Sequence, residues 1–192
     1  MQFPERFSDL PEYAFPRLRA LLDGVAPGGR EIAMSLGEPT HPFPDFVAET
    51  IAAHAGSFNR YPPNEGMPEL REAIAAWVAL RYGVSLDPAR EVFPLNGTRE
   101  GLFNACLALS PETKGGARPA VLLPNPFYQC YAAAALAVGA EPVYVPATAE
   151  TGFLPDFAAL PEEILARATI AYMCSPSNPQ GAVADTAWWQ GL

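Results

Sequence analysis

The spacing of hydrophobic residues predicts helices in the first part of the chain. Apolar side chains recur there every three or four positions, as on the buried face of a helix. The segments with this spacing are residues 15–25, 45–55 and 69–82. Pro68 precedes the third segment and Gly83 follows it, the usual order of these residues at helix ends. Residues 3–11 lack this period and predict an extended arm, while residues 32–36 predict a short strand before a proline-rich loop.

From residue 92 onward, short apolar runs alternate with helical patterns. The runs that predict strands are residues 92–95, 120–123, 143–145 and 169–174. Helices are expected from residue 98, over residues 127–138 and over part of 157–165. Continuous apolar runs are typical of parallel strands buried on both faces, and their alternation with helices indicates β-α-β units. The predicted fold class is therefore α/β, with a mostly parallel sheet flanked by helices.

Composition narrows the classes of function. Hydrophobic residues make up 49% of the 192 residues, enough for a sizeable core. The net charge of −9 argues against a nucleic-acid partner, and the longest alanine-rich apolar run, residues 131–139, is too short to cross a bilayer. Residues 1–9 lack the apolar segment of a secretion signal. The three cysteines are scattered among apolar neighbours, which favours reduced core thiols in a cytoplasmic protein.

Residues that could bind an anion follow the first predicted strand. Gly97 permits a tight turn and a close approach of the backbone to a ligand. Thr98 offers a hydroxyl at the expected N-cap of the next helix, and Arg99 places a cation in its first turn. A cation there opposes the helix dipole unless an anion binds at the helix start. The stretch is therefore interpreted as a phosphate site, and an ordinary turn with a surface arginine is the alternative.

Two further strand ends carry groups that suit a flat, phosphorylated heteroaromatic ring. The strand at 120–123 leads to Tyr128, and the strand at 169–174 leads to Asn178 in a proline-rich loop. In a parallel sheet both ends lie at the same edge as Thr98. Tyr128 could stack on the ring, and Asn178 could donate to an oxygen substituent. Taken singly, Tyr128 could also be a core aromatic residue and Asn178 a turn former.

The order of these motifs resembles that of the fold type I pyridoxal-phosphate-dependent aminotransferases, the aspartate aminotransferase-like superfamily. The resemblance extends over essentially the whole chain. The matching segments are Leu36-Gly-Glu-Pro39, Tyr61-Pro-Pro-Asn-Glu-Gly66, Glu69-Leu-Arg-Glu-Ala-Ile74, Asn96-Gly-Thr-Arg-Glu100, Pro124-Asn-Pro-Phe-Tyr128 and Ser175-Pro-Ser-Asn-Pro-Gln-Gly181. Within the superfamily, three stretches look most like the bacterial N-succinyldiaminopimelate aminotransferases of lysine biosynthesis. They are Tyr13-Ala-Phe-Pro-Arg-Leu-Arg-Ala-Leu-Leu22, Asn96-Gly-Thr-Arg-Glu100 and Pro124-Asn-Pro-Phe-Tyr-Gln129. Aminotransferases for aspartate or an aromatic amino acid are the alternative.

The resemblance implies a cofactor, substrates and a role for each matching residue. The cofactor would be pyridoxal 5′-phosphate, and the substrates would be amino acids and 2-oxo acids. Gly97, Thr98 and Arg99 would hold the phosphate, Tyr128 would stack on the pyridine ring, and Asn178 would bond its phenolic oxygen. Tyr61 would reach the phosphate bound by a neighbouring subunit, which implies a homodimer. Gly37 would lie beside the substrate carboxylate.

The chain departs from the family pattern in two respects. Gln180 stands where the family usually has threonine. In the family, the Schiff-base lysine, the acid facing the pyridine nitrogen and the substrate-binding arginine lie downstream of the last of these motifs, so they are expected beyond this sequence. Lys114, the chain's single lysine, is expected to be a solvated loop residue. The chain then corresponds to the N-terminal half of an aminotransferase. Residues 1–40 would be an arm and small-domain segment, and residues 41–192 an incomplete large domain. Alone it is expected to be inactive, and a non-catalytic fragment or regulatory module is the other alternative.

Overall fold

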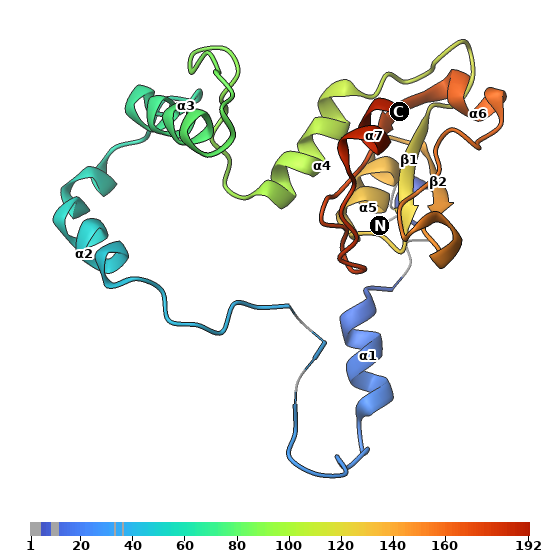
Figure 1. The fold of residues 1–192 in the computed structure, drawn as a ribbon, viewed down its shortest axis with the longest axis horizontal. Helices are drawn as coiled ribbons and strands as arrows, with labels where there is room; N and C mark the ends of the chain where they lie inside the picture. Colours follow the sequence, from blue (N-terminus) through green and yellow to red (C-terminus); the bar gives the residue numbers. More distant parts are fainter. Residues whose placement is uncertain (1–4, 9–11, 33, 36) are drawn as a thin grey trace. The chain divides into compact units, whose positions relative to one another are not determined.

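The computed structural model describes residues 5–8, 12–32, 34–35 and 37–192 (Figure 1). The described residues fall into two compact units. One unit holds residues 5–8 and 95–192, and the other holds residues 12–32, 34–35 and 37–94. The sequence predicts a different boundary, at residue 40, between a small-domain segment and the large domain of the family. That division into domains stays a prediction.

A three-stranded parallel sheet forms the centre of the first unit. Its strands are β1 (Ala120–Asn125), β2 (Glu141–Pro146) and β3 (Ala168–Ala171), in the order β2-β1-β3. Ala120 of β1 is aligned with Glu141 of β2 and with Ala168 of β3. The predicted α/β class and parallel arrangement are confirmed. The predicted strands at 120–123, 143–145 and 169–174 are also present, although the third ends at Ala171.

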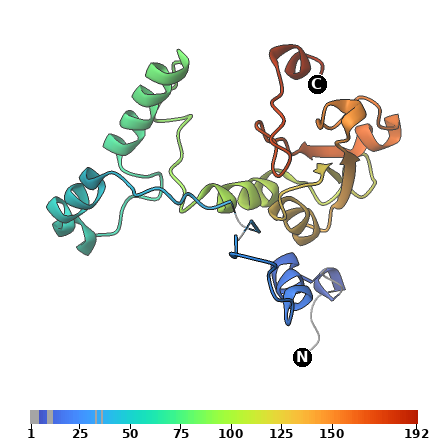
Figure 2. The same cartoon turned by 60° about the horizontal axis from the view of Figure 1, so that its bottom comes forward.

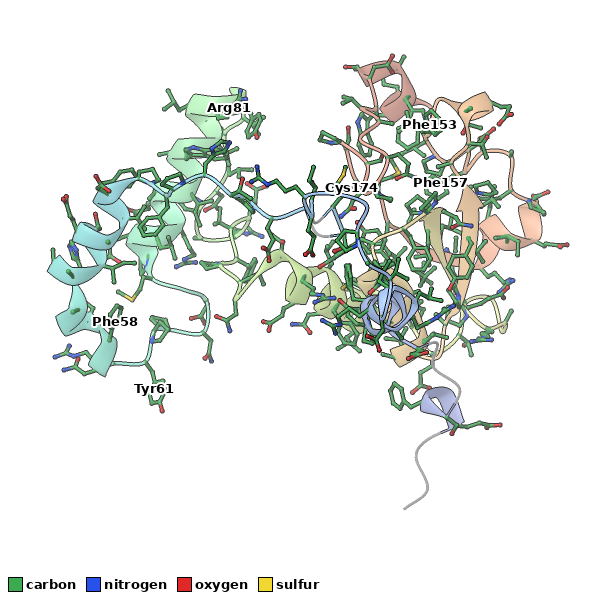
Figure 3. All side chains as sticks on the ribbon, turned by 90° about the horizontal axis from the view of Figure 1, so that it is seen from below. Phe58, Tyr61, Arg81, Phe153, Phe157 and Cys174 are labelled. Atoms are coloured by element: carbon green, nitrogen blue, oxygen red, sulfur yellow. The ribbon has the colours of Figure 1, made fainter. Side chains whose placement is uncertain are left out.

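Helices and a loop cover the two faces of this sheet (Figure 2). Val121 and Leu123 are fully buried on one face. They pack beneath α4 (Thr98–Leu109) and α5 (Cys130–Ala137), the latter rich in alanine. On the other face, Leu122 packs with Val145 and Phe157. Phe157 is labelled in Figure 3. The 3₁₀ helix η3 (Ala149–Thr151) and α6 (Glu162–Arg167) lie between β2 and β3 in the chain, and α7 (Thr186–Gln190) follows β3.

Charged side chains fasten the amino-terminal edge of the sheet. Arg118 donates from Nε to the Gly139 carbonyl at 2.9 Å and from Nη2 to the Ala140 carbonyl at 3.0 Å, just before β2. Arg167 pairs with Glu141 at 2.6 Å and donates to the Arg118 carbonyl at 3.1 Å. These charge-assisted bonds join the starts of all three strands. The loops that contain Tyr128 and Asn178 follow the strands at the opposite edge of the sheet.

Two predictions for the segments before and after β1 are wrong. Residues 92–95 form no strand, because Pro94 lacks an N–H group and the segment runs from one compact unit into the other, without a neighbouring strand. Helix α5 begins at Cys130 and not at residue 127, so Tyr128 lies in the loop after β1. Pro126 lies in this loop, and its fixed φ and missing N–H group favour a turn between β1 and the helix.

The second unit is helical. It contains α1 (Ala14–Leu22), α2 (Asp45–Ala53), the 3₁₀ helix η2 (Ala55–Asn59) and α3 (Pro68–Tyr82). The three predicted helices are confirmed, with the first two ending earlier than expected. Helix α3 stops at Gly83, whose φ of 69° suits a residue without a side chain. Among the described apolar residues of this unit, only Ala75 and Val92 are buried.

The remaining predictions for the amino-terminal segments are only partly covered by the described residues. In the predicted arm, Glu5–Phe7 forms the 3₁₀ helix η1, and residues 3, 4 and 9–11 lie outside the described residues. The predicted strand at 32–36 is absent at residues 32, 34 and 35, and its residues 33 and 36 lie outside the described residues. The described part of the arm is therefore helical and not extended.

The close packing of α5 on β1 predicts opposite outcomes at two adjacent alanines. Ala134 is fully buried, whereas Ala133 is exposed. We expect Ala134→Leu to lower the free energy of unfolding of the whole protein by about 1–3 kcal/mol, because added methylenes overpack a filled core. Ala133→Leu is the matched control and should change it by less than about 0.5 kcal/mol. Equal losses in urea denaturation would contradict this packing.

Candidate functional site

The start of α4 has an open backbone where the sequence predicts a phosphate site. Gly97 is the N-cap residue with φ 137° and ψ 144°, and no side chain caps the helix. The expected N-cap role of Thr98 is therefore wrong. Thr98 is the first helical residue, because the backbone before it takes a conformation that favours glycine. A Cβ atom built at Gly97 would have no atom within 4 Å, so a ligand can approach this backbone.

Arg99 and Tyr128 bring the start of α4 and the loop after β1 together. The Arg99 guanidinium carbon lies 5.6 Å from the centroid of the Tyr128 ring, a cation-π distance. The Cys130 thiol donates to the Arg99 carbonyl at 3.3 Å. Tyr128 is half-buried in that loop. A cation and an aromatic ring thus stand next to the glycine at the helix start.

The loop after β3, which carries Asn178, is closed by its own hydrogen bonds. The Gly181 amide donates to the Ser177 carbonyl at 2.7 Å, and the Ser177 amide donates to the Ala182 carbonyl at 2.8 Å. Gln180 Nε2 donates to the Pro126 carbonyl at 3.4 Å, which links this loop to the loop after β1. Asn178 itself is exposed. The structure thus joins the segments of Arg99, Tyr128 and Asn178, and their contact with one ligand stays a prediction.

Two tyrosines that sequence reasoning missed lie beneath these segments. Tyr128 meets Tyr131 edge-on at 5.7 Å between ring centroids, and Tyr131 stacks on Tyr172 at 4.3 Å with an interplanar angle of 8°. Tyr172 donates from its hydroxyl to the Leu102 carbonyl of α4 at 2.7 Å. The available signal was a tyrosine within each apolar run, since a buried Tyr usually needs a partner for its hydroxyl.

Burial makes these groups harder to deprotonate. It raises the pKa of Tyr131 to about 12 and also raises the pKa of Tyr172, so the Tyr172 hydroxyl remains a donor. Burial likewise raises the pKa of the Cys130 thiol, although Arg99 acts in the opposite direction. A thiol that stays protonated is a weak nucleophile, which agrees with the expectation that Cys130 is a core residue.

Gly37 and Tyr61, the remaining predicted site residues, belong to the other compact unit. A Cβ atom built at Gly37 would meet nothing within 4 Å. The Tyr61 side chain is fully exposed, and Figure 3 shows it pointing away from its ribbon. Their predicted roles, beside a substrate carboxylate and toward a neighbouring subunit, stay predictions.

Lys114 lies at the edge of the sheet opposite the candidate site. Its side chain is exposed, as expected, but its Nζ atom also donates to the Ala168 carbonyl at the start of β3. The Tyr128 and Asn178 loops follow the other ends of the strands. Lys114 therefore cannot serve a ligand held beside those loops.

Other kinds of site find little support. Among residues 5–8, 12–32, 34–35 and 37–192, no group of three His, Cys, Asp or Glu side chains could hold a metal ion. No helix in the same part of the chain has the length and apolarity needed to span a membrane. A hollow of about 320 Å³ lies along α1, lined by Tyr13, Phe15, Leu18, Arg19, Leu22 and Ser35. Its lining is mostly apolar and lacks paired catalytic groups.

Comparisons with known proteins agree on one family. The family described as aminotransferase class I and II matches residues 30–192. An LL-diaminopimelate aminotransferase of Desulforudis audaxviator is 40% identical over 190 residues, which are 96% of this chain and 47% of that protein. One from Dehalococcoides mccartyi is 37% identical over 188 residues, covering 96% and 47%. The chain spans about half the length of the curated relatives it matches.

Solved structures give the same result. An aminotransferase from Neisseria meningitidis superposes with a TM-score of 0.89 at 35% identity, covering 97% of this chain and 48% of its own. Substrate-bound BacF from Bacillus subtilis superposes with a TM-score of 0.83 at 31% identity, covering 98% and 48%. The chain and each of these structures therefore share their backbone over nearly all of this sequence.

The buried tyrosines predict sensitivity to alkali. The folded protein holds the Tyr131 proton up to a pKa of about 12, whereas the ordinary value is 10. The resulting stabilisation is complete below the ordinary pKa and is lost as pH rises through the folded one. Between about pH 9 and 11, the urea midpoint of the whole protein should fall less steeply in Tyr131→Phe than in wild type. Tyr13→Phe, at an exposed position, should keep the wild-type slope. Parallel slopes for Tyr131→Phe and wild type would refute the assignment.

Proposed function

We propose that this chain, which belongs to the class I and II aminotransferase family, is part of a pyridoxal-phosphate-dependent aminotransferase. The observation that carries the proposal is the pairing of Arg99 with Tyr128 beside the open backbone of Gly97. An uncapped helix start with a nearby cation suits a phosphate dianion, and an aromatic ring next to it suits a pyridine ring. The donor set therefore fits the cofactor.

Each predicted site residue has a binding task in this proposal. Gly97 and Thr98 present backbone and hydroxyl groups to the phosphate, and Arg99 balances its charge. The Tyr128 ring stacks on the pyridine ring, and the Asn178 carboxamide donates to its phenolic oxygen. When bound, pyridoxal phosphate supplies an electron sink for the carbon that loses or gains the amino group. These side chains hold and orient it.

We propose that the amino donor has a diaminopimelate skeleton. The sequence motifs favour the N-succinylated form, whereas the relatives named above carry the name of the unmodified LL form. The two differ at the end remote from the reacting amine. That end is a free amino acid in one form and a succinyl amide with an extra carboxylate in the other. The acceptor would be 2-oxoglutarate in both cases.

We also propose a homodimer that works in the cytoplasm. A fully exposed Tyr61 supports a contact with a second subunit, whose cofactor phosphate it would reach. Many apolar side chains of the second unit are also exposed, including Phe46, Phe58 and Leu80. Three cysteines without disulfides suit a reducing compartment. A separate part of the proposal concerns the substrate: Gly37 has no side chain and would therefore leave room for the substrate carboxylate.

Substrate profiling tests the proposed reaction. The whole protein with added pyridoxal phosphate is assayed for glutamate formation from 2-oxoglutarate with four donors: LL-diaminopimelate, its N-succinyl derivative, aspartate and phenylalanine. We expect one diaminopimelate form to exceed aspartate and phenylalanine in kcat/KM by about tenfold or more, the discrimination that a few polar contacts provide. The better of the two forms identifies the donor. A preference for aspartate or phenylalanine would reject the diaminopimelate assignment, and no turnover of any donor would reject the reaction.

Reductive trapping tests the place of the reactive lysine. Borohydride treatment of the whole protein with its cofactor should attach the cofactor to one lysine, located by peptide mapping. Because Lys114 is bonded to Ala168 at the opposite edge of the sheet, we expect no label there. Lys114→Arg should also retain full activity and labelling. Label on Lys114 would contradict the placement of the site.

A further inference from the structure

Tyr172 connects four elements directly beneath the candidate site. Its backbone amide donates to the Leu122 carbonyl of β1 at 2.9 Å, one residue beyond the end of β3. Its ring stacks on Tyr131 of α5. Its hydroxyl donates to the Leu102 carbonyl of α4 at 2.7 Å. The residue is 5% exposed, so these contacts are shielded from water.

These contacts close a ring that includes the proposed phosphate and pyridine contacts. Arg99 lies over Tyr128, Tyr128 meets Tyr131, and Tyr131 stacks on Tyr172. Tyr172 bonds to Leu102, which lies on α4 three residues after Arg99. Residues three or four apart lie on the same side of a helix, so the Tyr172 bond is about one turn from Thr98. Displacing α4 along the sheet would therefore strain this bond and move the helix start.

The hydroxyl is not needed to fill space. A phenylalanine would occupy the same volume and keep the stack on Tyr131, and it would avoid burying a polar group, which is costly without a partner. The oxygen does provide a directional bond to the backbone of α4. Packing alone lets a helix slide by small amounts, whereas a short hydrogen bond fixes one point on it. Tyr172 thus differs from an ordinary core aromatic residue in its hydroxyl, whose bond fixes the position of α4.

We propose that Tyr172 is a positioning residue that sets the start of α4 relative to Tyr128 and so determines how tightly the cofactor phosphate is held. The inference rests on the proposed function, because it requires the phosphate at Gly97, Thr98 and Arg99. Tyr172 touches neither the cofactor nor the substrate. Its effect should therefore fall on the phosphate and much less on the ring.

The experiment compares binding of pyridoxal phosphate and of pyridoxal, which lacks the phosphate. Dissociation constants are measured by fluorescence titration of the whole protein freed of cofactor, as wild type, Tyr172→Phe and Tyr144→Phe. The last is the control, a tyrosine of β2 whose ring packs against Phe127 at 5.1 Å. For Tyr172→Phe we expect the Kd of pyridoxal phosphate to rise about 2- to 10-fold, the loss of one neutral hydrogen bond. The Kd of pyridoxal should change less than about twofold, and Tyr144→Phe should change neither.

A second measurement remains informative if Tyr172→Phe is less stable. The rise in Tm of each cofactor-free protein with added inorganic phosphate reports phosphate binding by mass action, whatever the starting Tm. We expect a smaller rise in Tyr172→Phe than in wild type and Tyr144→Phe. A lower Tm with unchanged affinities and an unchanged phosphate response would show a merely structural role and overturn the inference, as would equal losses for both ligands. If wild type binds no pyridoxal phosphate, the proposed function fails, and this inference with it.

Discussion

The burial of β1 on both faces is the constraint on which the rest of the first unit depends. Val121 and Leu123 pack beneath α4 and α5, while Leu122 packs against the layer that contains Phe157. A strand covered in this way can present polar chemistry only at its ends. Its start is occupied by bonds from Arg118 to the backbone before β2. The loops at the other end are consequently where a ligand can be bound.

The same packing explains how residues far apart in the sequence meet. The alanines of α5 allow this helix to lie close to β1, which brings Tyr131 under Tyr128 and onto Tyr172. Tyr172 follows β3, stacks on Tyr131 of α5 and bonds to α4, so this one buried residue contacts the sheet and both helices. Rigid elements hold binding groups more accurately than mobile loops do. Arg99 lies on α4, and Tyr128 lies in the loop that leads directly into α5, so the two packed helices hold this pair.

The sequence was sufficient for the architecture and for the proximity of the segments that carry Arg99, Tyr128 and Asn178. Continuous apolar runs predicted the parallel strands, because both faces of such strands are buried. The errors have physical causes. A run such as residues 92–95 needs a neighbouring strand to pair with, and pattern alone does not reveal its absence. Thr98 was expected as the N-cap by residue type, whereas the backbone at Gly97 decides where the helix begins. The Tyr172 bond is between side chain and backbone across 70 residues, and no periodicity encodes it.

The central claim is that Gly97, Thr98, Tyr128 and Asn178 face a single cofactor at the carboxyl ends of the strands. A crystal structure of the whole protein grown with pyridoxal phosphate tests it most directly. We expect density for the phosphate against the backbone of Gly97 and Thr98, with the pyridine ring on Tyr128 and its phenolic oxygen within hydrogen-bonding distance of Asn178. Cofactor density at the Lys114 edge of the sheet, or a ring remote from Tyr128, would contradict the account.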